Sequence, residues 1–443
     1  MMGNSNGNDQ SVFPHSWVKT TLGECFTWSS GGTPLKSYSG YYGGDIPWVI
    51  IGDLNDAVVF DTQTKITQKG LENSSAKWVE EGSVLLAMYG SIGKLGIAGR
   101  KMTTNQAIAF TKPDLINEKY LFFYLLRERS NLNALGMGAT QLNISQTVIK
   151  AYPFILAPLA EQHRIVAKIE ELFTQLDASE AALQRAKANL ERYRRSVLQA
   201  AVTGELVPQD PNDEPVEEML KHTDPEWRSL IINSPYLPSL PLGWCWTDLK
   251  SLSSSADYGT SQKCNYLNNS APVLRIPNII NGSLNLDDLK FAINPEKLST
   301  SKSLQPNDFL IIRTNGSRDL IGRSALIRWP FVTPYYFASY LIRFRVSQCS
   351  EWIASIWDSS TIRSQIEEIA ATSAGQYNVS ISSLSKIQIP LPPIREQNRI
   401  IAEIQRQLSV QRKVLATLSV ACNRVSHLRQ SILKLAFEGR LVE

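Results

Sequence analysis

Apolar residues recur every seven positions along two long stretches of the chain, and this period is typical of helices that pack against a partner helix. A helix of about 45 residues is roughly 65 Å long, so it needs a partner to bury its apolar stripe. The stripe consists of Ile169, Leu176, Leu183, Leu190 and Val197 in the first stretch and Ile404, Leu418, Val425 and Ile432 in the second. Ser179, Gln407 and Gln411 interrupt it, and polar residues at such positions can fix register and partner choice.

The two stretches are copies of one another. Residues 158–207 align with residues 393–442 without a gap, so that Pro158 meets Pro393 and Gly204 meets Gly439. Proline suits the first turn of a helix and glycine its end, so both copies carry start and stop signals. One such run could form an exposed dimerisation coiled coil, but two matched copies in one chain favour pairing within the chain.

A variable region precedes each copy. The apolar runs WVIIGDL, SVLLAMYG, PVLRIPNII and DFLIIRTNG are bounded by turn residues and predict strands. EKYLFFYLLRERS and CSEWIASIWDSSTIRSQIEEIA predict helices, and the acidic segment between the halves reads as a linker with one short helix. The chain is therefore predicted to be α+β, with variable domains at 12–157 and 236–392, long helices at 158–206 and 393–443, and an acidic linker at 207–235.

The composition is that of a globular protein with buried cores, because 43% of the 443 residues are apolar and 19% are charged. No apolar run approaches the roughly 18 residues that span a bilayer, so we expect a cytoplasmic protein with no membrane partner. Five scattered cysteines without a C-x-x-C pair are expected to be reduced thiols. The net charge of +4 permits a DNA partner but does not establish one.

Motifs of catalysis are weak in this chain. GSIGKLG at Gly90 resembles a phosphate-binding loop, but Met88 and Leu95 occupy positions where that motif needs Gly and Ser or Thr. NSPY at Asn233 departs from the Asn-Pro-Pro-Tyr motif of amino-methyltransferases and lies in the linker. The histidines have no partner at metal-ligand spacing, and they are His15, His163, His222 and His427. We therefore expect neither a catalytic nor a metal-binding residue.

Each variable region has instead a polar turn, YGSIGKLG in the first half and NGSRDLIG in the second. Arginine pairs with guanine and asparagine with adenine in the major groove, while serine, lysine and backbone amides contact phosphates. Such residues are most often merely solvated, so the turns alone do not establish DNA binding. The candidate DNA-contacting residues are Tyr89, Ser91, Lys94 and Gln141 in the first half and Arg313, Asn315, Ser317, Arg318 and Gln376 in the second.

Together these features resemble the specificity subunits of Type I restriction–modification systems. The shared pattern is two variable regions, each followed by P-[LI]-x-E-Q-x-x-I and a long helix ending S-[VI]-L-x-x-A-x-x-G-x-L-V, with PQDPNDEP between the halves. By this resemblance each variable region is a target recognition domain that reads one half of a split DNA sequence. The helices are then an antiparallel coiled-coil spacer, related by a pseudo-two-fold axis, on which methyltransferase subunits dock.

The resemblance also implies the partners, which are double-stranded DNA, two methyltransferase subunits and restriction or motor subunits that join through the complex. S-adenosylmethionine, ATP and Mg are expected on those partners, and this chain is expected to bind no cofactor and to be no enzyme. Two similar domains on one duplex should read half-sites about one helical turn apart. Because their loops differ, the whole site should be asymmetric. The alternatives are a coiled-coil scaffold without DNA specificity and a methyltransferase that acts alone.

Overall fold

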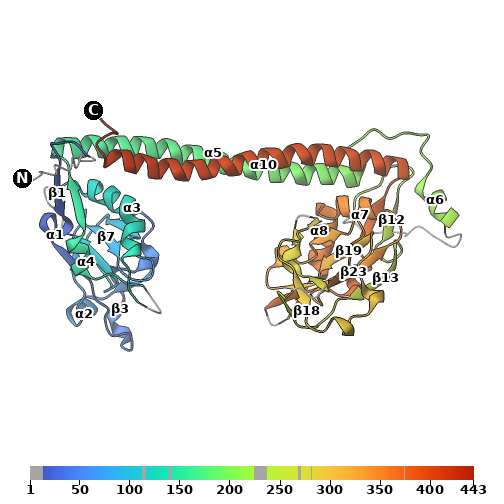
Figure 1. The fold of residues 1–443 in the computed structure, drawn as a ribbon, viewed down its shortest axis with the longest axis horizontal. Helices are drawn as coiled ribbons and strands as arrows, with labels where there is room; N and C mark the ends of the chain where they lie inside the picture. Colours follow the sequence, from blue (N-terminus) through green and yellow to red (C-terminus); the bar gives the residue numbers. More distant parts are fainter. Residues whose placement is uncertain are drawn as a thin grey trace, which may run out of the picture. The chain divides into compact units, whose positions relative to one another are not determined.

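The computed structural model describes residues 13–111, 116–138, 142–223, 237–267, 271–280, 282–373 and 375–443. The chain divides into two compact units (Figure 1), and each unit is considered by itself. Unit 1 comprises Met1–Gln184 and Ser419–Glu443, and unit 2 comprises Arg185–Leu418. Each unit therefore joins one variable domain to a segment of both long helices.

Unit 1 is built around a five-stranded sheet covered by one helix. In order across the sheet, the strands are β2 (Trp28–Ser30), β10 (Ile108–Thr111), β7 (Val84–Ala87), β8 (Leu95–Ala98) and β4 (Ala57–Val59). Both faces of β7 are buried, which explains its uninterrupted apolar sequence VLLA. Helix α3 (Glu118–Ala134) packs on this sheet, and the side-chain oxygen of Asn117 caps its N-terminus.

A second sheet of unit 1 has the order β5 (Lys65–Ile66), β3 (Tyr42–Val49), β9 (Met102–Thr104) and β6 (Trp78–Val79). The short helices of the unit are α1 (Leu22–Cys25), α2 (Gln68–Glu72) and α4 (Gln146–Ala151). Strand β3 ends at Val49 and a 3₁₀ turn follows at Ile51–Asp53, so only Trp48 and Val49 of the predicted strand WVIIGDL are strand. Asp53 accepts a hydrogen bond from the amide of Ile50 and thereby favours the turn.

Unit 2 repeats the plan with differences. Its central sheet has the order β13 (Ser253–Tyr258), β23 (Leu341–Val346), β19 (Asp308–Ile312) and β21 (Ser324–Leu326). A second sheet has the order β14 (Cys264–Asn265), β18 (Lys290–Ala292), β15 (Pro272–Leu274) and β22 (Tyr336–Phe337). A hairpin of β16 (Ile279–Ile280) and β17 (Ser283–Leu284) contacts β21 of the central sheet. A third sheet contains β20 (Thr314–Asn315), β25 (Gln376–Asn378) and β24 (Ala371–Ser373).

Two helices cover the central sheet of unit 2 where the sequence predicted one. They are α7 (Ser350–Ile356) and α8 (Ser360–Ile369), and α9 (Ile381–Leu384) follows them. Trp357 lies in the break and donates its indole N–H to the carbonyl of Gly322 at 2.6 Å. This buried contact holds the chain at a bend that the apolar pattern alone does not reveal. The described part of the linker contains a short helix, α6 (Val216–Thr223).

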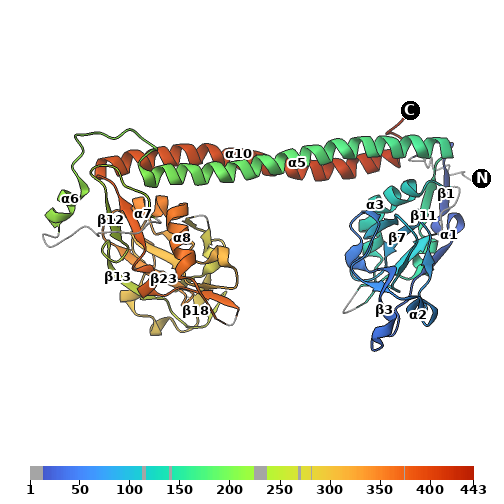
Figure 2. The ribbon, with the colours of Figure 1, turned by 180° about the vertical axis from the view of Figure 1, so that it is seen from behind.

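Both units tie the start of the variable domain to its end. Strand β1 (Val18–Thr21) pairs with β11 (Pro153–Leu156) in unit 1, as Figure 2 shows, and β12 (Cys245–Asp248) pairs with β26 (Gln388–Leu391) in unit 2. The repeated glutamine has the same role in each copy. Gln162 donates to the carbonyl of Ala157 and Gln397 to that of Pro392, both at 2.8 Å, so each side chain anchors its long helix to the preceding strand.

The long helices are α5 (Leu159–Thr203) and α10 (Ile394–Ala436). In unit 2, Tyr193 donates to Gln407 at 2.8 Å and Gln411 donates to the Leu190 carbonyl at 2.7 Å, so the two segments run antiparallel. In unit 1, the guanidinium of Arg429 lies over the ring of Phe173. The α+β class and the pairing of long helices within the chain are thus confirmed.

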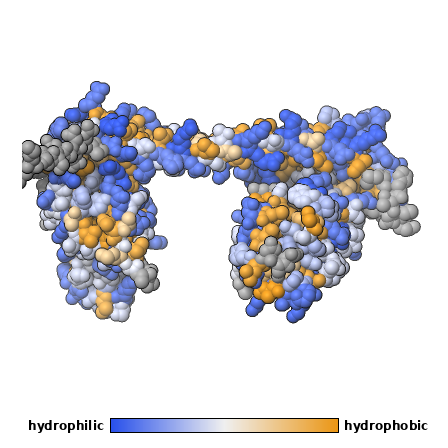
Figure 3. All heavy atoms as spheres, viewed as in Figure 1, coloured by the Kyte–Doolittle hydropathy of each residue, from blue (hydrophilic) through white to orange (hydrophobic). Residues whose placement is uncertain are grey.

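The predicted apolar stripe lies on the buried side of these helices. Ile169, Val197, Ile404 and Val425 are buried, and Leu176, Leu183, Leu190, Leu418 and Ile432 are half-buried. Gln411 is also buried, whereas Val410 and Val420 are exposed. The visible surface of the long helices is mostly hydrophilic (Figure 3). Helix α5 ends at Thr203 and α10 at Ala436, a few residues before the limits of the predicted ranges, and Gly204 and Gly439 adopt left-handed conformations with φ of 73° and 68°. Within the described ranges, no helix combines the length and apolarity needed to cross a membrane.

Candidate nucleic-acid interface

The predicted residues of unit 2 come from segments far apart in sequence, and the third sheet brings them together. Strand β20 pairs with β25 so that Thr314 lies opposite Asn378 and Asn315 opposite Tyr377. The Thr314 hydroxyl donates to the side-chain oxygen of Gln376 at 3.5 Å. Gln376 is exposed. Arg313, Asn315 and Gln376 therefore lie on one small surface, which we call the Arg313 cluster.

Arg313 is held at both its backbone and its side chain. Its amide donates to the carbonyl of Tyr340 at 2.9 Å, and its carbonyl accepts from Val379 at 2.9 Å. Its guanidinium lies 4.6 Å from the centroid of the Tyr258 ring, and within the described part of the chain its buried Nε has no hydrogen-bond partner. A stacked guanidinium is a planar fork with fixed direction, which is the geometry that reads a guanine edge.

Tyr258 was not identified from the sequence. It ends strand β13, and its hydroxyl accepts a hydrogen bond from the amide of Ile381 at 3.2 Å. The ring is thus fixed at one end by the sheet and at the other by the start of α9. An aromatic residue at a strand end before a glycine is the only signal in the sequence, and it does not show which arginine will stack on the ring.

The turn that follows Arg313 carries the remaining candidates of unit 2, and each of them has a different environment. Asn315 accepts a hydrogen bond from the amide of Ser317 at 2.8 Å, which occupies its carbonyl oxygen and leaves its side-chain amide available. Ser317 is exposed. Arg318 pairs with Glu367 of α8 at 3.7 Å, and both side chains are about half exposed. Such a pair contributes little to stability and can exchange for a phosphate.

Unit 1 has an equivalent arrangement with different side chains. Tyr89 forms an isolated antiparallel bridge with Asn143, and the amide of Gly90 donates to the Leu142 carbonyl at 2.9 Å. Ser91 is exposed and Lys94 is half-buried. Gln141 lies outside the described residues. The described candidates Tyr89, Ser91 and Lys94 belong to one tight turn, closed by a hydrogen bond of 3.1 Å from the Lys94 amide to the Ser91 carbonyl.

A buried charge network supports the central sheet of unit 2. Arg343 is 2% exposed and pairs with Asp257, while Arg345 pairs with the fully buried Asp308 at 2.8 Å. The hydrogen bond to Asp308 raises the pKa of Arg345 above its usual value. Two guanidinium groups and two carboxylates balance one another, so the network orients β13, β19 and β23 without adding net charge.

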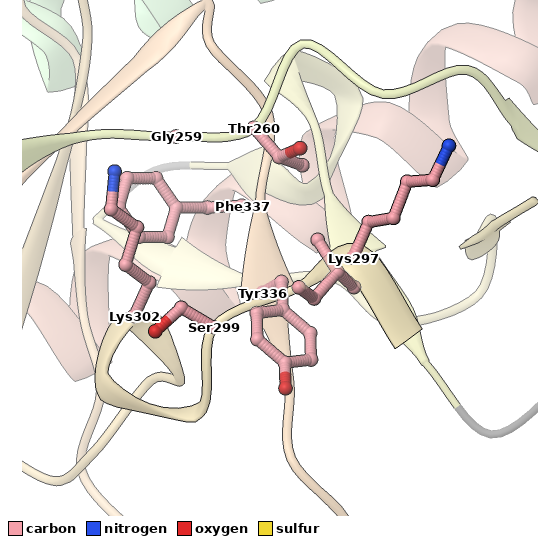
Figure 4. Close-up of a pocket in the computed structure, with 8 residues that line it drawn as sticks. Gly259, Thr260, Lys297, Ser299, Lys302, Tyr336 and Phe337 are labelled. Carbon is pink, nitrogen blue, oxygen red and sulfur yellow. The ribbon is translucent and has the colours of Figure 1, made fainter. Parts of the chain in front are cut away.

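A small cavity beside the Arg313 cluster was also missed by sequence reasoning. Its volume is about 200 Å³. Figure 4 shows it with Thr260 and Tyr336 between Lys297 and Lys302, and it begins directly after Tyr258 in the chain. The lining residues are Gly259, Thr260, Lys297, Leu298, Ser299, Lys302, Tyr336 and Phe337. They come from four separate segments, so no sequence motif marks them.

The weak catalytic motifs gain no support. GSIGKLG is a turn between β7 and β8, with Gly93 at a φ of 84° and its carbonyl bound by Arg129. Among the described residues, no three His, Cys, Asp or Glu side chains form a group that could hold a metal ion. NSPY lies outside the described residues. All five cysteines are free, and burial raises the pKa of Cys245 to about 12.

Comparison with known proteins gives one consistent result. A family model described as Type I restriction modification DNA specificity domain matches residues 14–188 and 249–417. The EcoKI specificity subunit of Escherichia coli K12 is 25% identical over 97% of this chain and 90% of its own length. The StySPI specificity subunit of Salmonella potsdam is 24% identical over 98% of this chain and 91% of its own length.

The fold has a relative among solved structures. One chain from a study of complex assembly and conformational transition in the type I R-M system superposes with a TM-score of 0.70. It is 18% identical in sequence, and the match covers 97% of this chain and 99% of that one. At that identity the match supports the fold alone.

Proposed function

Because the chain belongs to the Type I restriction modification DNA specificity family, we propose that each of its units reads one half of a bipartite DNA target. The observation that carries this proposal is the Arg313 cluster and its counterpart around Tyr89. The same backbone pairing recurs in both units, at β20 with β25 and at Tyr89 with Asn143. The side chains it presents differ, so the two half-sites are expected to differ in sequence.

The partners follow from this role. We propose that two methyltransferase subunits dock on the paired helices and that restriction or motor subunits join through them. Half-exposed polar side chains such as Gln407, together with exposed apolar ones such as Val410, provide such a surface. The number of residues between the two domains in α5 and α10 would then set the number of unread base pairs.

Chemistry is assigned to the partners. S-adenosylmethionine, ATP and Mg are proposed to bind the methyltransferase and motor subunits. This chain recognises the DNA target and holds the subunits together. Its expected location is the cytoplasm, where the DNA lies in the bacteria that hold the relatives. A coiled-coil scaffold without DNA specificity would use the same helices but would leave the Arg313 cluster without a role.

The first test is genomic adenine methylation. Cells that carry this chain with its methyltransferase subunit are compared with cells that carry the methyltransferase alone. The proposal expects methylation at a split, asymmetric motif only when this chain is present. A methyltransferase activity in the purified chain alone would contradict it.

A second measurement separates DNA recognition from a pure scaffold. The assembled complex is titrated with duplexes that contain or lack the methylated motif, at several salt concentrations. Recognition predicts preference for the motif and an affinity that falls steeply with salt, because phosphate contacts release counterions. Association with the methyltransferase without any preference among duplexes would favour the scaffold.

A further inference from the structure

We propose that the cavity around Thr260 in unit 2, which we call the lysine cavity, binds a phosphodiester group of the DNA backbone beside the base that Arg313 reads. This inference rests on the proposed function, because it names the part of the DNA that the cavity takes. The cavity is about 200 Å³ in volume and is lined by both polar and apolar side chains. This volume is large enough for a phosphate group but too small to enclose the sugar and base of the same nucleotide as well.

The side chains that line the lysine cavity have the chemistry of an anion site. Their charged groups are the ammonium groups of Lys297 and Lys302, and their polar groups are the hydroxyls of Thr260, Ser299 and Tyr336. No lining residue is a carboxylate. Figure 4 places the two lysines on opposite sides of Thr260 and Tyr336, with their ammonium groups at the outer ends of extended side chains that can turn toward a bound anion. Phosphates are typically bound by lysine and hydroxyl donors of this kind.

The charges of the two lysines are not already neutralised. Across the described part of the chain, neither Lys297 nor Lys302 takes part in an ion pair, and both are exposed. The carboxylates of the central sheet, Asp257 and Asp308, are paired with Arg343 and Arg345. Phe337 is a lining residue, and the guanidinium of Arg343 lies 5.7 Å from the centroid of its ring. The charged groups that line the cavity are therefore both cations.

The lysine cavity adjoins the Arg313 cluster through three consecutive residues. Tyr258 carries the Arg313 guanidinium on its ring, and Gly259 and Thr260 are the first wall of the cavity. Gly259 packs against the carbonyls of Phe337 and Ala338 too closely for any side chain, which fixes Thr260 at this wall. On a duplex, every base edge lies close to backbone phosphates. A contact from Arg313 to a base edge and a contact from the lysine cavity to a phosphate would together fix the register of unit 2 on its half-site.

The equivalent segment of unit 1 is packed closely against its neighbours. The amide of Gly32 donates to the Thr104 carbonyl at 3.0 Å, just as the amide of Thr260 donates to the Phe337 carbonyl at 2.8 Å. A side chain at Gly32 would collide with Ser75 and the backbone of Ala76. A residue with a hydroxyl side chain, as Thr260 has in unit 2, therefore does not fit at Gly32 in unit 1. The proposed phosphate contact concerns the second half-site.

The test uses the complex of the full chain with its methyltransferase subunits and a duplex that carries the methylated motif. Binding is measured by fluorescence anisotropy over a range of KCl concentrations for wild type and for Lys297→Gln/Lys302→Gln. The matched control is Lys250→Gln, an exposed lysine of unit 2 outside the cavity. We expect the double variant to lose on the order of tenfold in affinity, equally on target and non-target duplexes, and the salt slope to fall by about 1. Lys297→Arg/Lys302→Arg should restore both.

Modified DNA identifies the phosphate. Single methylphosphonate linkages, which are uncharged, are placed one at a time along the second half-site. One position should weaken wild-type binding and have no further effect on the Gln double variant. An unchanged salt slope in the double variant overturns the inference. The inference also fails if the wild-type protein binds inorganic phosphate in calorimetry but every methylphosphonate weakens the wild type and the double variant equally. A wild-type complex without preference for its motif would instead refute the proposed function.

Discussion

Arg313 is oriented before any DNA is bound. Its backbone is fixed by hydrogen bonds to Tyr340 and Val379, and its guanidinium is stacked on Tyr258. The sequence identified Arg313 because it lies in a polar turn next to Asn315. It could not identify Tyr258, because the stacking joins two strands that are distant in the chain. A preorganised side chain loses little conformational entropy on binding and therefore discriminates more sharply between bases.

The first prediction concerns Arg313 itself. Arg313→Ala should weaken binding to DNA by about 1 to 3 kcal/mol, and the loss should depend on the bases of the second half-site only. Competition among duplexes with single base changes measures this. The matched change in unit 1, Tyr89→Ala, should alter preference for the first half-site. An equal loss on every duplex after Arg313→Ala would make Arg313 a phosphate contact.

The second prediction concerns the thiols. Burial raises the pKa of Cys245 to about 12, so at pH 8 this thiol remains protonated and is a poor nucleophile. Brief treatment of the folded protein with iodoacetamide at pH 8, followed by mass spectrometry, should leave Cys245 unmodified. Treatment in denaturant, where its pKa returns to normal, is the control and should modify it. Rapid modification of Cys245 in the folded protein would show that it is exposed in solution.

At the scale of elements, the repeated helices were the most predictable part of the chain. Their seven-residue period, Pro158 and Pro393 at the starts and Gly204 and Gly439 at the ends gave bounds close to those observed. Periodicity is a local property of the sequence, so it can be detected before the fold is known. On α10, Gln411 is buried at the stripe position where the sequence places a polar interruption.

Elements whose limits depend on distant contacts were less predictable. The break between α7 and α8 depends on the contact of Trp357 with Gly322, and the lysine cavity depends on four segments that meet only after folding. The candidate turns were located correctly, and β20 joined to β25 shows why Arg313, Asn315 and Gln376 belong together. Which of them touches a base remains a prediction, because loop geometry decides it.

The third prediction concerns the length of α5. Deletion of Leu183–Asn189 removes one seven-residue repeat and about 10 Å of helix, while it keeps the apolar stripe in phase on each side. Methylation mapping should then reveal a motif whose halves are unchanged but whose unread spacer is shorter, or no assembled complex. Deletion of seven residues from the linker is the control and should leave the motif unchanged. The same spacer after loss of the repeat would refute the role of the helix as a ruler.

At the scale of the whole molecule, each unit has a large core of its own to which both long helices contribute. In unit 1, Ile165 and Ile169 of α5 pack with Leu433 near the end of α10. In unit 2, Val197 and Leu198 of α5 pack with Ile400 of α10. Each variable domain is therefore completed by helix segments from both copies of the repeat.

The fourth prediction follows from these separate cores. Phe437 is 1% exposed and packs against Tyr120 and Tyr124 in unit 1, whereas Trp352 is fully buried in unit 2. Phe437→Ala and Trp352→Ala should each cost about 3 to 5 kcal/mol of stability. Calorimetry of the wild-type chain should show two transitions, and each variant should lower a different one. A single transition that both variants lower equally would mean that the units unfold as one.

The glycines that end the long helices have a further consequence. Gly439 packs against Pro14 in unit 1, as Gly204 packs against Pro241 in unit 2. The last residues of the chain thus meet the start of the first variable domain in the same way that the end of α5 meets the start of the second. A permuted gene that encodes the second variable domain and α10 first, followed by a new connection and then the first domain and α5, would preserve every contact within both units. The order in which the two half-site readers are translated is therefore not dictated by the fold.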